Sequence, residues 1–212
     1  MLADRDVAQG ASLAPMSAQW MPRRVFIVGG PGSGKTTLAN RIGRALAMPV
    51  HDLDAIAYED GAGQKRELGL RRADAEQLAR MPGWVAEGIY LWWTQPLAER
   101  ADRIAWLDVP WRVAAFRIVR RHVLADLAGA NRHPGLKKLA QFMWGARRYY
   151  VGRTPAALAS IDAGDDGAIT RIATEAWLRR YSNKVTRCQT TSDLDELIAG
   201  ATARATQLIK TV

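Results

Sequence analysis

Short apolar runs alternate along the chain with longer stretches in which hydrophobic residues recur every three or four positions. The short runs have the length and the β-branched and aromatic content of buried strands, and the longer stretches have the period of helices. Strands that alternate with helices predict an α/β protein with a parallel sheet covered on both faces. The predicted strands are Val25–Val28, a short strand that begins at Pro49–His51 and ends at Asp52–Asp54, Trp84–Ala86, Arg103–Leu107 and Lys184–Cys188.

The helical stretches fall between these strands. We predict helices from the end of a glycine-rich loop to about Ala47, and then at about 73–81, 111–128, 135–150 and 167–182, with a last one from near Ser192. Residues 55–72 are expected to be loop, because Asp60-Gly61-Ala62-Gly63 supplies turn chemistry within them.

One motif follows the first strand directly. Residues 29–37 read Gly-Gly-Pro-Gly-Ser-Gly-Lys-Thr-Thr, which fits GxxxxGK[ST] between a strand and a helix. Glycines let successive backbone N–H groups curl around an anion, and a helix N-terminus favours negative charge. We therefore expect Mg·ATP or Mg·GTP to be bound by the loop residues Gly30, Pro31, Gly32, Ser33, Gly34, Lys35, Thr36 and Thr37.

Phosphoryl transfer needs a cation on the phosphates, a metal anchor and a group that binds the acceptor. Lys35 is expected to reach the β- and γ-phosphates, and the Thr36 hydroxyl to be a ligand of Mg²⁺. Glu87 follows the third strand and is a candidate to hold Mg²⁺ through water near Thr36. Asp54, just beyond the second strand, is a candidate to bind an acceptor hydroxyl and accept its proton. For both acids, the alternative is a helix cap or a solvated loop position.

Two further acids, Asp52 and Asp108, also fall at predicted strand ends, on the same edge as the phosphate loop. The carboxyl ends of parallel strands are where ligands bind in such sheets. Strand ends often carry Asp for turn reasons alone, so these two residues are weaker candidates.

Arginines cluster on the helix predicted after Pro110. Arg117 and Arg121 are four residues apart and share a face, and Arg120 lies near the edge of an apolar stripe. Their guanidinium groups are expected to close over the phosphates as charge builds up in the transition state. A solvated basic face is the alternative.

Aromatic residues follow Glu87 closely. Trp92 and Trp93 are candidates to wall an acceptor pocket, and Tyr90 to orient its polar group. Core packing is the alternative for aromatic residues at this density.

The composition favours a single soluble domain. The chain has 212 residues, 48% of them hydrophobic, yet no apolar stretch approaches the ~20 residues that cross a bilayer. Cys188 is the only cysteine, which fits a reducing cytoplasm. Residues 1–22 have no continuous apolar region, so we expect a disordered extension there and no secretory signal.

The basic charge is concentrated in one segment. The formal net charge is +9, and residues 111–153 hold ten basic residues against one acid. Arginines that bind a nucleotide would account for such an excess. A surface that binds nucleic acid would account for it too.

In this order, the motifs resemble those of adenylate-kinase-like P-loop kinases, most closely the DNA topology modulation proteins. Besides the phosphate loop, the similar features are Leu53-Asp54, Trp84-Val85-Ala86-Glu87-Gly88-Ile89-Tyr90, Ile104–Pro110, the arginines 117, 120 and 121, Asn131-Arg132 and Trp144 with Arg147, Arg148 and Tyr149. The chain departs from the group at Glu87, which usually is Asp, and at Ile89, which usually is Asn.

The resemblance implies a three-layer P-loop NTPase fold over about residues 23–200, with five parallel strands flanked by helices. It also implies an acceptor-binding subdomain at about 53–82, a helical lid at about 111–153, and a helix end and tail at 201–212. ATP as the phosphoryl donor is likewise implied by the family.

Three functions are consistent with these residues. We favour an ATP-dependent kinase of a small acceptor, such as a nucleotide, a nucleoside or another hydroxyl compound. The second is a nucleic-acid-binding regulator that uses ATP to change shape, and the third is a degenerate kinase that binds ATP without turnover. Intact Lys35 and Thr36 count against the third. The acceptor and the oligomeric state are left open by the sequence.

Overall fold

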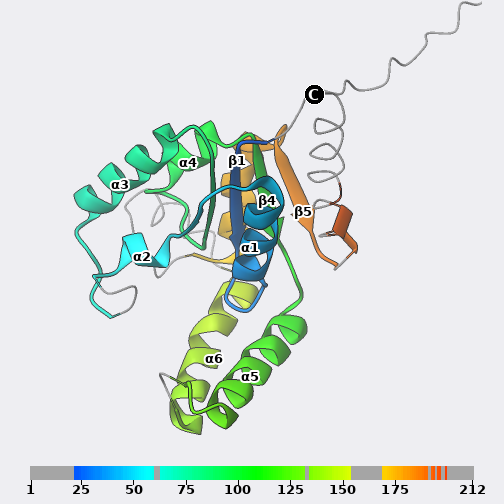
Figure 1. Ribbon diagram of the computed structural model, residues 1–212. Helices are drawn as coiled ribbons and strands as arrows, with labels where there is room; N and C mark the ends of the chain where they lie inside the picture. The colour runs from blue at the N-terminus through cyan, green and yellow to red at the C-terminus, as the bar shows by residue number, and fades with distance from the viewer. Residues whose placement is uncertain are drawn as a thin grey trace, which may run out of the picture.

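A five-stranded sheet forms the centre of the computed structural model, which describes residues 22–59, 63–131, 134–153 and 169–190, with 192, 193, 195, 196 and 199 (Figure 1). The expected disordered extension, apart from Pro22, and the tail 201–212 lie outside the described residues. The strands are β1 (Arg24–Gly29), β2 (Val50–Asp52), β3 (Trp84–Gly88), β4 (Arg103–Leu107) and β5 (Val185–Cys188).

Helices connect these strands. They are α1 (Lys35–Leu46), α2 (Asp54–Ala57), α3 (Leu68–Arg80), α4 (Gln95–Arg100), α5 (Trp111–Leu127), α6 (Leu136–Val151), α8 (Arg171–Leu178) and the 3₁₀ turn η2 (Arg179–Tyr181).

All strand pairs in the sheet are parallel, in the order β2-β3-β1-β4-β5. The predicted α/β class and the five-stranded parallel sheet flanked by helices are therefore confirmed. After β1, the chain first adds strands on one side and then crosses to the other. A crevice beyond the carboxyl ends of the strands opens at such a reversal of order.

Two apolar clusters cover the two faces of the sheet. Successive side chains of a strand point to opposite faces, so Val25 and Ile27 of β1 pack against α1. Phe26 and Val28 face the other way, into a larger cluster that includes Trp84, Trp106, Leu78 of α3, Leu97 of α4 and Trp177 of α8. The sheet is thus the middle of three layers, and its core holds the strand ends in fixed register.

The segment 55–72, predicted to be loop, is partly helical. It contains most of α2, and α3 begins at Leu68, five residues before the predicted start. Leu68 packs against the larger cluster, and the Arg71 N–H donates to the Glu67 carbonyl at 3.1 Å. Helix-forming Leu and Arg residues together with this tertiary contact outweigh the turn residues that precede them.

Helices α5 and α6 lie side by side and project beyond the carboxyl ends of the strands (Figure 1). They form a helical hairpin over the segment expected to be a lid. Within the described part of the chain, no helix combines the length and the apolar character needed to cross a membrane.

Candidate active site

The loop between β1 and α1 turns around two glycines. Gly32 has a φ of 75° and Gly34 a φ of 103°, a region that residues with a Cβ rarely adopt. Gly34 is the N-cap of α1, so the first N–H groups of that helix have no acceptor within it. The Ser33 hydroxyl is buried and has no hydrogen-bond partner among the described residues. The loop therefore offers unpaired donors around a tight turn, as an anion site requires.

The helical hairpin contacts this loop from outside. Arg117 of α5 donates through Nη1 to the Ser33 carbonyl at 2.6 Å. The Tyr150 hydroxyl, at the end of α6, donates to the Pro31 carbonyl at 2.8 Å, and its ring packs at a tilt against Trp111 with centroids 5.4 Å apart. Both helices are thus tied to the phosphate loop.

Lys35 and Thr36, the first residues of α1, meet Glu87 of β3. The Thr36 hydroxyl donates to Glu87 Oε1 at 2.5 Å, and Lys35 Nζ donates to the Gly30 carbonyl at 3.3 Å. Burial raises the pKa of Glu87, against the opposing effect of Lys35 and the Thr36 hydrogen bond. Burial likewise lowers the pKa of Lys35, although Glu87 and two aspartates oppose that shift. Each charge in this group is only partly compensated by the others.

Two aspartates add carboxylates near Glu87, Asp52 at the end of β2 and Asp54 at the start of α2. Asp52 is the register partner of Glu87 on the neighbouring strand, and its Oδ1 accepts the Asp54 N–H at 2.9 Å. The Tyr90 hydroxyl donates to Asp54 Oδ1 at 2.7 Å. Burial, followed by the nearby Asp54 charge and this hydrogen bond, raises the pKa of Tyr90, so the phenol keeps its proton. Tyr90 therefore fixes the orientation of the Asp54 carboxylate.

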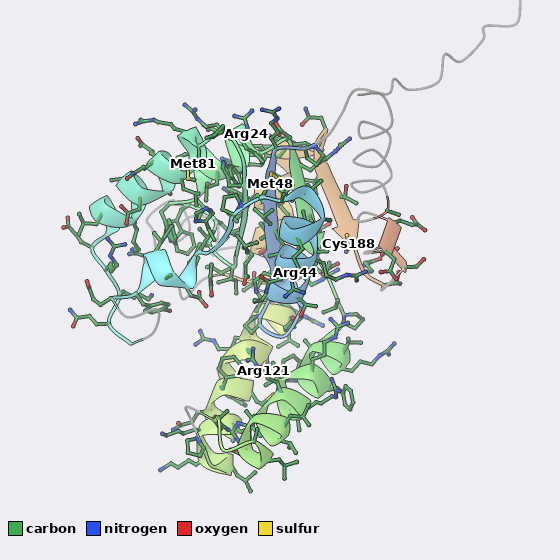
Figure 2. The ribbon with its side chains drawn as sticks, in the orientation of Figure 1. Arg24, Arg44, Met48, Met81, Arg121 and Cys188 are labelled. Atoms are coloured by element: carbon green, nitrogen blue, oxygen red, sulfur yellow. The ribbon has the colours of Figure 1, made fainter. Side chains whose placement is uncertain are left out.

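A cavity of about 1090 Å³ joins the phosphate loop, the strand ends and the hairpin. Its lining includes residues 31–37 and all of Lys35, Asp54, Arg117 and Arg121, the predicted catalytic residues, together with Glu87. Arg121 lies on the hairpin (Figure 2), and its charge acts on Lys35.

Gly30 is the one predicted nucleotide-binding residue that does not line the cavity. It lies against the ring of Tyr149, and a Cβ built on it would overlap that ring. Gly30 therefore allows the loop to pack closely against α6.

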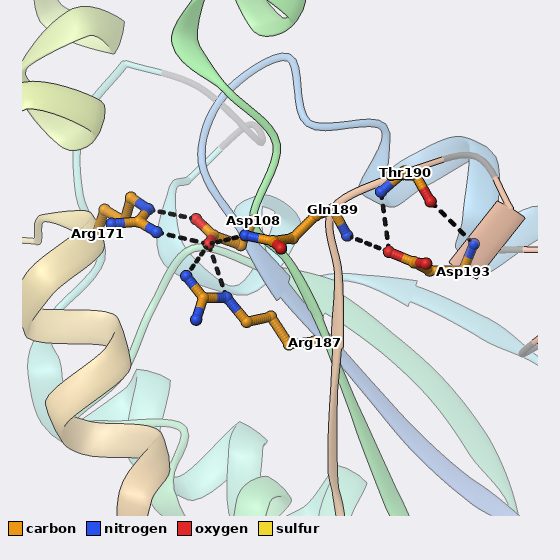
Figure 3. A network of polar contacts seen from close by, with 6 residues as sticks. All are labelled: Asp108, Arg171, Arg187, Gln189, Thr190 and Asp193. Atoms are coloured by element: carbon orange, nitrogen blue, oxygen red, sulfur yellow. Dashed lines mark hydrogen bonds and ion pairs between the residues drawn. The ribbon is translucent and has the colours of Figure 1, made fainter.

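Asp108 is the acid that does not join the cavity wall. It lies just beyond β4, and its carboxylate accepts from Arg171 at 2.5 and 2.8 Å, from Arg187 at 2.5 and 2.8 Å and from Gln189 at 3.3 Å (Figure 3). Burial alone would raise the pKa of Asp108, but the hydrogen bonds from the two arginines outweigh it and hold the pKa below its ordinary value. Asp108 thus lies at the same edge of the sheet as the other three acids, as expected, but its oxygens are used by the fold and it does not line the cavity.

Trp92 and Trp93 do not line the cavity either. Trp93 is fully buried and Trp92 is 7% exposed, and both belong to the larger core cluster. The core alternative therefore holds for these two residues, while Tyr90 reaches the cavity. Asn131 bonds within the hairpin, to Asp126 at 2.6 Å, and Arg132 lies outside the described residues.

Several cavity residues, Arg41 among them, carry a weak functional signal in the sequence or none. Asp52 was a weak candidate, yet the register of β2 on β3 puts it beside Glu87. Tyr58 follows α2 within the segment expected to be loop, and Arg148 of α6 is separated in sequence from the arginines of α5. The 31-residue spacing of Arg148 from Arg117 carries no periodic signal, so only the folded hairpin brings them to one cavity.

No protein-family model matches the chain, and no curated protein has significant sequence similarity to it. Among solved structures, it is similar to a gluconokinase from Sinorhizobium meliloti (16% identity, 91% of this chain and 97% of the other, TM-score 0.46). It is also similar to a sugar kinase from Janibacter (17%, 86% and 97%, TM-score 0.46). A third similar structure is shikimate kinase from Acinetobacter baumannii in complex with shikimate (18%, 77% and 95%, TM-score 0.41). Identities and TM-scores this low do not indicate a shared substrate.

Proposed function

We propose that the protein transfers the γ-phosphoryl group of Mg·ATP to a hydroxyl group of a small acceptor. One observation carries the proposal. A single cavity contains a phosphate-loop lysine, the Thr36–Glu87 pair, the Asp54–Tyr90 pair and arginines of two hairpin helices. These are the parts that phosphoryl transfer needs, namely phosphate binding, a metal anchor, an acceptor site and cations for the developing charge.

The loop residues fit a triphosphate. The unpartnered Ser33 hydroxyl, the two left-handed glycines and the free N–H groups at the start of α1 all supply donors for phosphate oxygens. Lys35 adds one positive charge beside them. The preference for ATP over GTP, and membership of the adenylate-kinase-like class near the DNA topology modulation proteins, belong to the proposal through the motif resemblance.

The oxygens around Thr36 fit Mg²⁺. A hydroxyl and carboxylates are hard donors of the kind this ion prefers, and it commonly keeps several waters. Thr36 would bind it directly, and Glu87 would hold it through water, with Asp52 beside Glu87. When bound, Mg²⁺ neutralises charge on the phosphates. The partly compensated Glu87 carboxylate suits this role.

Asp54 is proposed to bind the acceptor hydroxyl and accept its proton. Tyr90 holds one carboxylate oxygen at 2.7 Å, and the other has no hydrogen bond from the residues that the structure describes, so it is proposed to bind the acceptor. Arg117, Arg120, Arg121 and Arg148 line the cavity from the hairpin, and their guanidinium groups would bind phosphate oxygens more strongly as charge develops on them. With the hairpin closed, water is excluded and the phosphoryl group passes to the acceptor.

The test is a screen of hydroxyl compounds for ADP release with Mg·ATP, using the full chain. A no-acceptor reaction measures idle hydrolysis, and mass spectrometry identifies the phosphorylated product. We expect at least one acceptor to raise ADP release well above idle hydrolysis, and Lys35→Ala to abolish that increase. Equal turnover by a folded Lys35→Ala variant would remove the proposed mechanism.

A second function is favoured by the outer side of α6. Trp144 is 72% exposed there, and neither it nor the exposed Lys137 and Arg147 lines the cavity. An exposed aromatic ring among cations suits a single-stranded nucleic acid. Binding of a labelled oligonucleotide that weakens steeply with salt and requires Trp144 would support a nucleotide-dependent regulator. The cavity-lining arginines are explained without it, so the kinase is our conclusion.

A further inference from the structure

The charges on the cavity wall are separated by sign. Its cations come from the phosphate-loop helix and the hairpin: Lys35, Arg41, Arg117, Arg120, Arg121 and Arg148. Its carboxylates come from the ends of β2 and β3 and the start of α2: Asp52, Asp54 and Glu87. Between residues 47 and 107, the described lining contains no lysine or arginine. We call these two sets the basic wall and the acidic wall.

Arg66 and Arg71, two basic residues near the acidic wall in sequence, are engaged elsewhere. Arg66 donates to the Ile56 carbonyl at 3.1 Å and to Asp74 at 2.6 Å. Arg71 is 6% exposed, and its guanidinium lies 5.9 Å from the centre of the Trp93 ring. Neither lines the cavity. The undescribed segments 60–62 and 154–168 contain aspartates and no lysine or arginine.

The hydrogen-bonding groups of the acidic wall chiefly accept. The Tyr90 hydroxyl and the Asp54 N–H, both donors, are already bonded to Asp54 and Asp52. The remaining carboxylate oxygens call for hydroxyl or ammonium groups on a ligand. The charge of Lys35 acts on all three carboxylates, but in the proposed function Lys35 and the Mg²⁺ beside Glu87 and Asp52 are committed to the phosphates of ATP. A carboxylate or phosphate on the acceptor would then face Asp54 with no lysine or arginine of residues 47–107 lining the cavity beside it, and such like-charge contacts are unfavourable.

We infer that the acceptor carries no negative charge and is a polyhydroxy compound, neutral or bearing an amine. This inference rests on the proposed kinase function and excludes nucleoside monophosphates and sugar acids. In the reaction, the acceptor oxygen forms a bond to the γ-phosphorus, and the bond from that phosphorus to the β,γ-bridging oxygen breaks. ADP leaves with the electron pair, and the hydroxyl proton passes to Asp54.

Matched acceptors that differ in charge test this inference with the full chain and Mg·ATP. One set is glucosamine, glucose and gluconate; a second is ribose and ribose 5-phosphate; a third is adenosine and AMP. Within a set that is phosphorylated, we expect kcat/KM for the neutral or amine member to exceed that of the anion by about 100-fold or more. Preference for the anion would overturn the inference and leave the kinase standing. Idle hydrolysis alone in every set would remove the kinase and this inference with it.

A binding measurement gives an answer without turnover. Di(adenosine) pentaphosphate carries a second, phosphate-bearing nucleotide beyond the length of ATP. Calorimetry with Mg²⁺ is expected to give it an affinity within about tenfold of that of ATP, since its far end gains no cation on the acidic wall. Binding about 100-fold tighter than ATP would overturn the inference.

Ile89 offers a variant that should weaken the selectivity. It is half-buried, lines the acidic wall and has no role in the proposed chemistry. Ile89→Lys is expected to raise the use or binding of gluconate relative to glucose by about tenfold, with Ile89→Leu as the matched control. Melting curves verify that both variants fold. An unchanged ratio of gluconate to glucose use in a folded Ile89→Lys variant would contradict the inference that the charge of the acidic wall determines which acceptor is used.

Discussion

Glu87 and Asp108 are two strand-end carboxylates that differ in what surrounds them. Both are 3% exposed, and they lie at the carboxyl ends of the two strands that flank β1: Glu87 is the last residue but one of β3, and Asp108 follows β4. Glu87 receives one hydroxyl hydrogen bond and faces a cavity, whereas two arginines and a glutamine surround Asp108 (Figure 3). Burial therefore raises the pKa of Glu87, while arginine hydrogen bonds hold that of Asp108 down.

The difference separates a residue available for chemistry from one used by the fold. A buried carboxylate with all its oxygens bonded has nothing left for a metal or a substrate. One that keeps a poorly compensated charge beside a cavity has free acceptor capacity, which is common at functional sites. A carboxylate near the carboxyl end of a strand, which both residues provide, does not make this distinction.

The largest expected effect comes from removing Lys35, the cation that acts on Glu87. Lys35→Ala should lower kcat/KM by about 1000-fold or more, because charge on the transferring phosphoryl group loses its nearest ammonium. Steady-state kinetics of ADP release give the number. Lys137→Ala, on the exposed side of α6, is the matched control and should keep near-normal turnover. Comparable losses in both variants would contradict a specific role for Lys35.

The acceptor side of the Glu87 region should be nearly as sensitive. Asp54→Asn removes the proposed proton acceptor while keeping its shape, so kcat should fall by about 100-fold. Tyr90→Phe removes only the hydrogen bond that orients Asp54 and should cost about tenfold or less. Single-turnover kinetics with saturating acceptor measure both. A larger loss for Tyr90→Phe than for Asp54→Asn would argue against Asp54 as the base.

Glu87→Gln should weaken the response to magnesium without lowering the stability of the fold. The Mg²⁺ concentration for half-maximal activity should rise about tenfold or more, since a charged outer ligand is lost. The folded-state pKa of Glu87 is raised, so its charge lowers stability as pH rises through that pKa. Glu87→Gln should therefore melt at the same or a higher temperature at neutral pH. A lower melting temperature would show that Glu87 is structural, like Asp108.

Asp108→Asn should have the smallest effect on turnover, within about twofold, and should instead destabilise the fold. Two arginines lose their anionic partner, at a cost of about 1–3 kcal/mol, which is several degrees in melting temperature. The folded-state pKa lies below the ordinary 3.8, so this stabilisation is present above about pH 4 and lost as pH falls below it. Melting curves from pH 2.5 to 7 should converge for the two proteins at the acidic end. Parallel curves would contradict this ionic contribution.

The sheet and the phosphate loop were predictable because their signals are local. Apolar runs of strand length gave the five strands, and the order of glycines, lysine and hydroxyl residue gave the loop. The start of α3 at Leu68 is not predicted by the local sequence, because the packing of Leu68 against the larger core cluster exists only in the folded protein.

The partners of the strand-end acids could not be predicted in the same way. Asp108 meets residues 63 and 79 positions later in the chain, and Asp52 meets Glu87 through the register of β2 on β3. Such pairings depend on topology, so a list of strand-end acids contains both functional and structural members. Trp93 is another case, since local sequence does not separate a pocket wall from a core residue.

The contact between Gly30 and Tyr149 has an evolutionary consequence. The phosphate-loop motif allows any residue at position 30, yet a Cβ there would overlap the Tyr149 ring and lie 2.8 Å from that of Tyr150. A larger residue at 30 is compatible with this fold only if the aromatic at 149 shrinks or withdraws. Across related sequences, we therefore expect these two positions to covary, although they lie 119 positions apart in the chain.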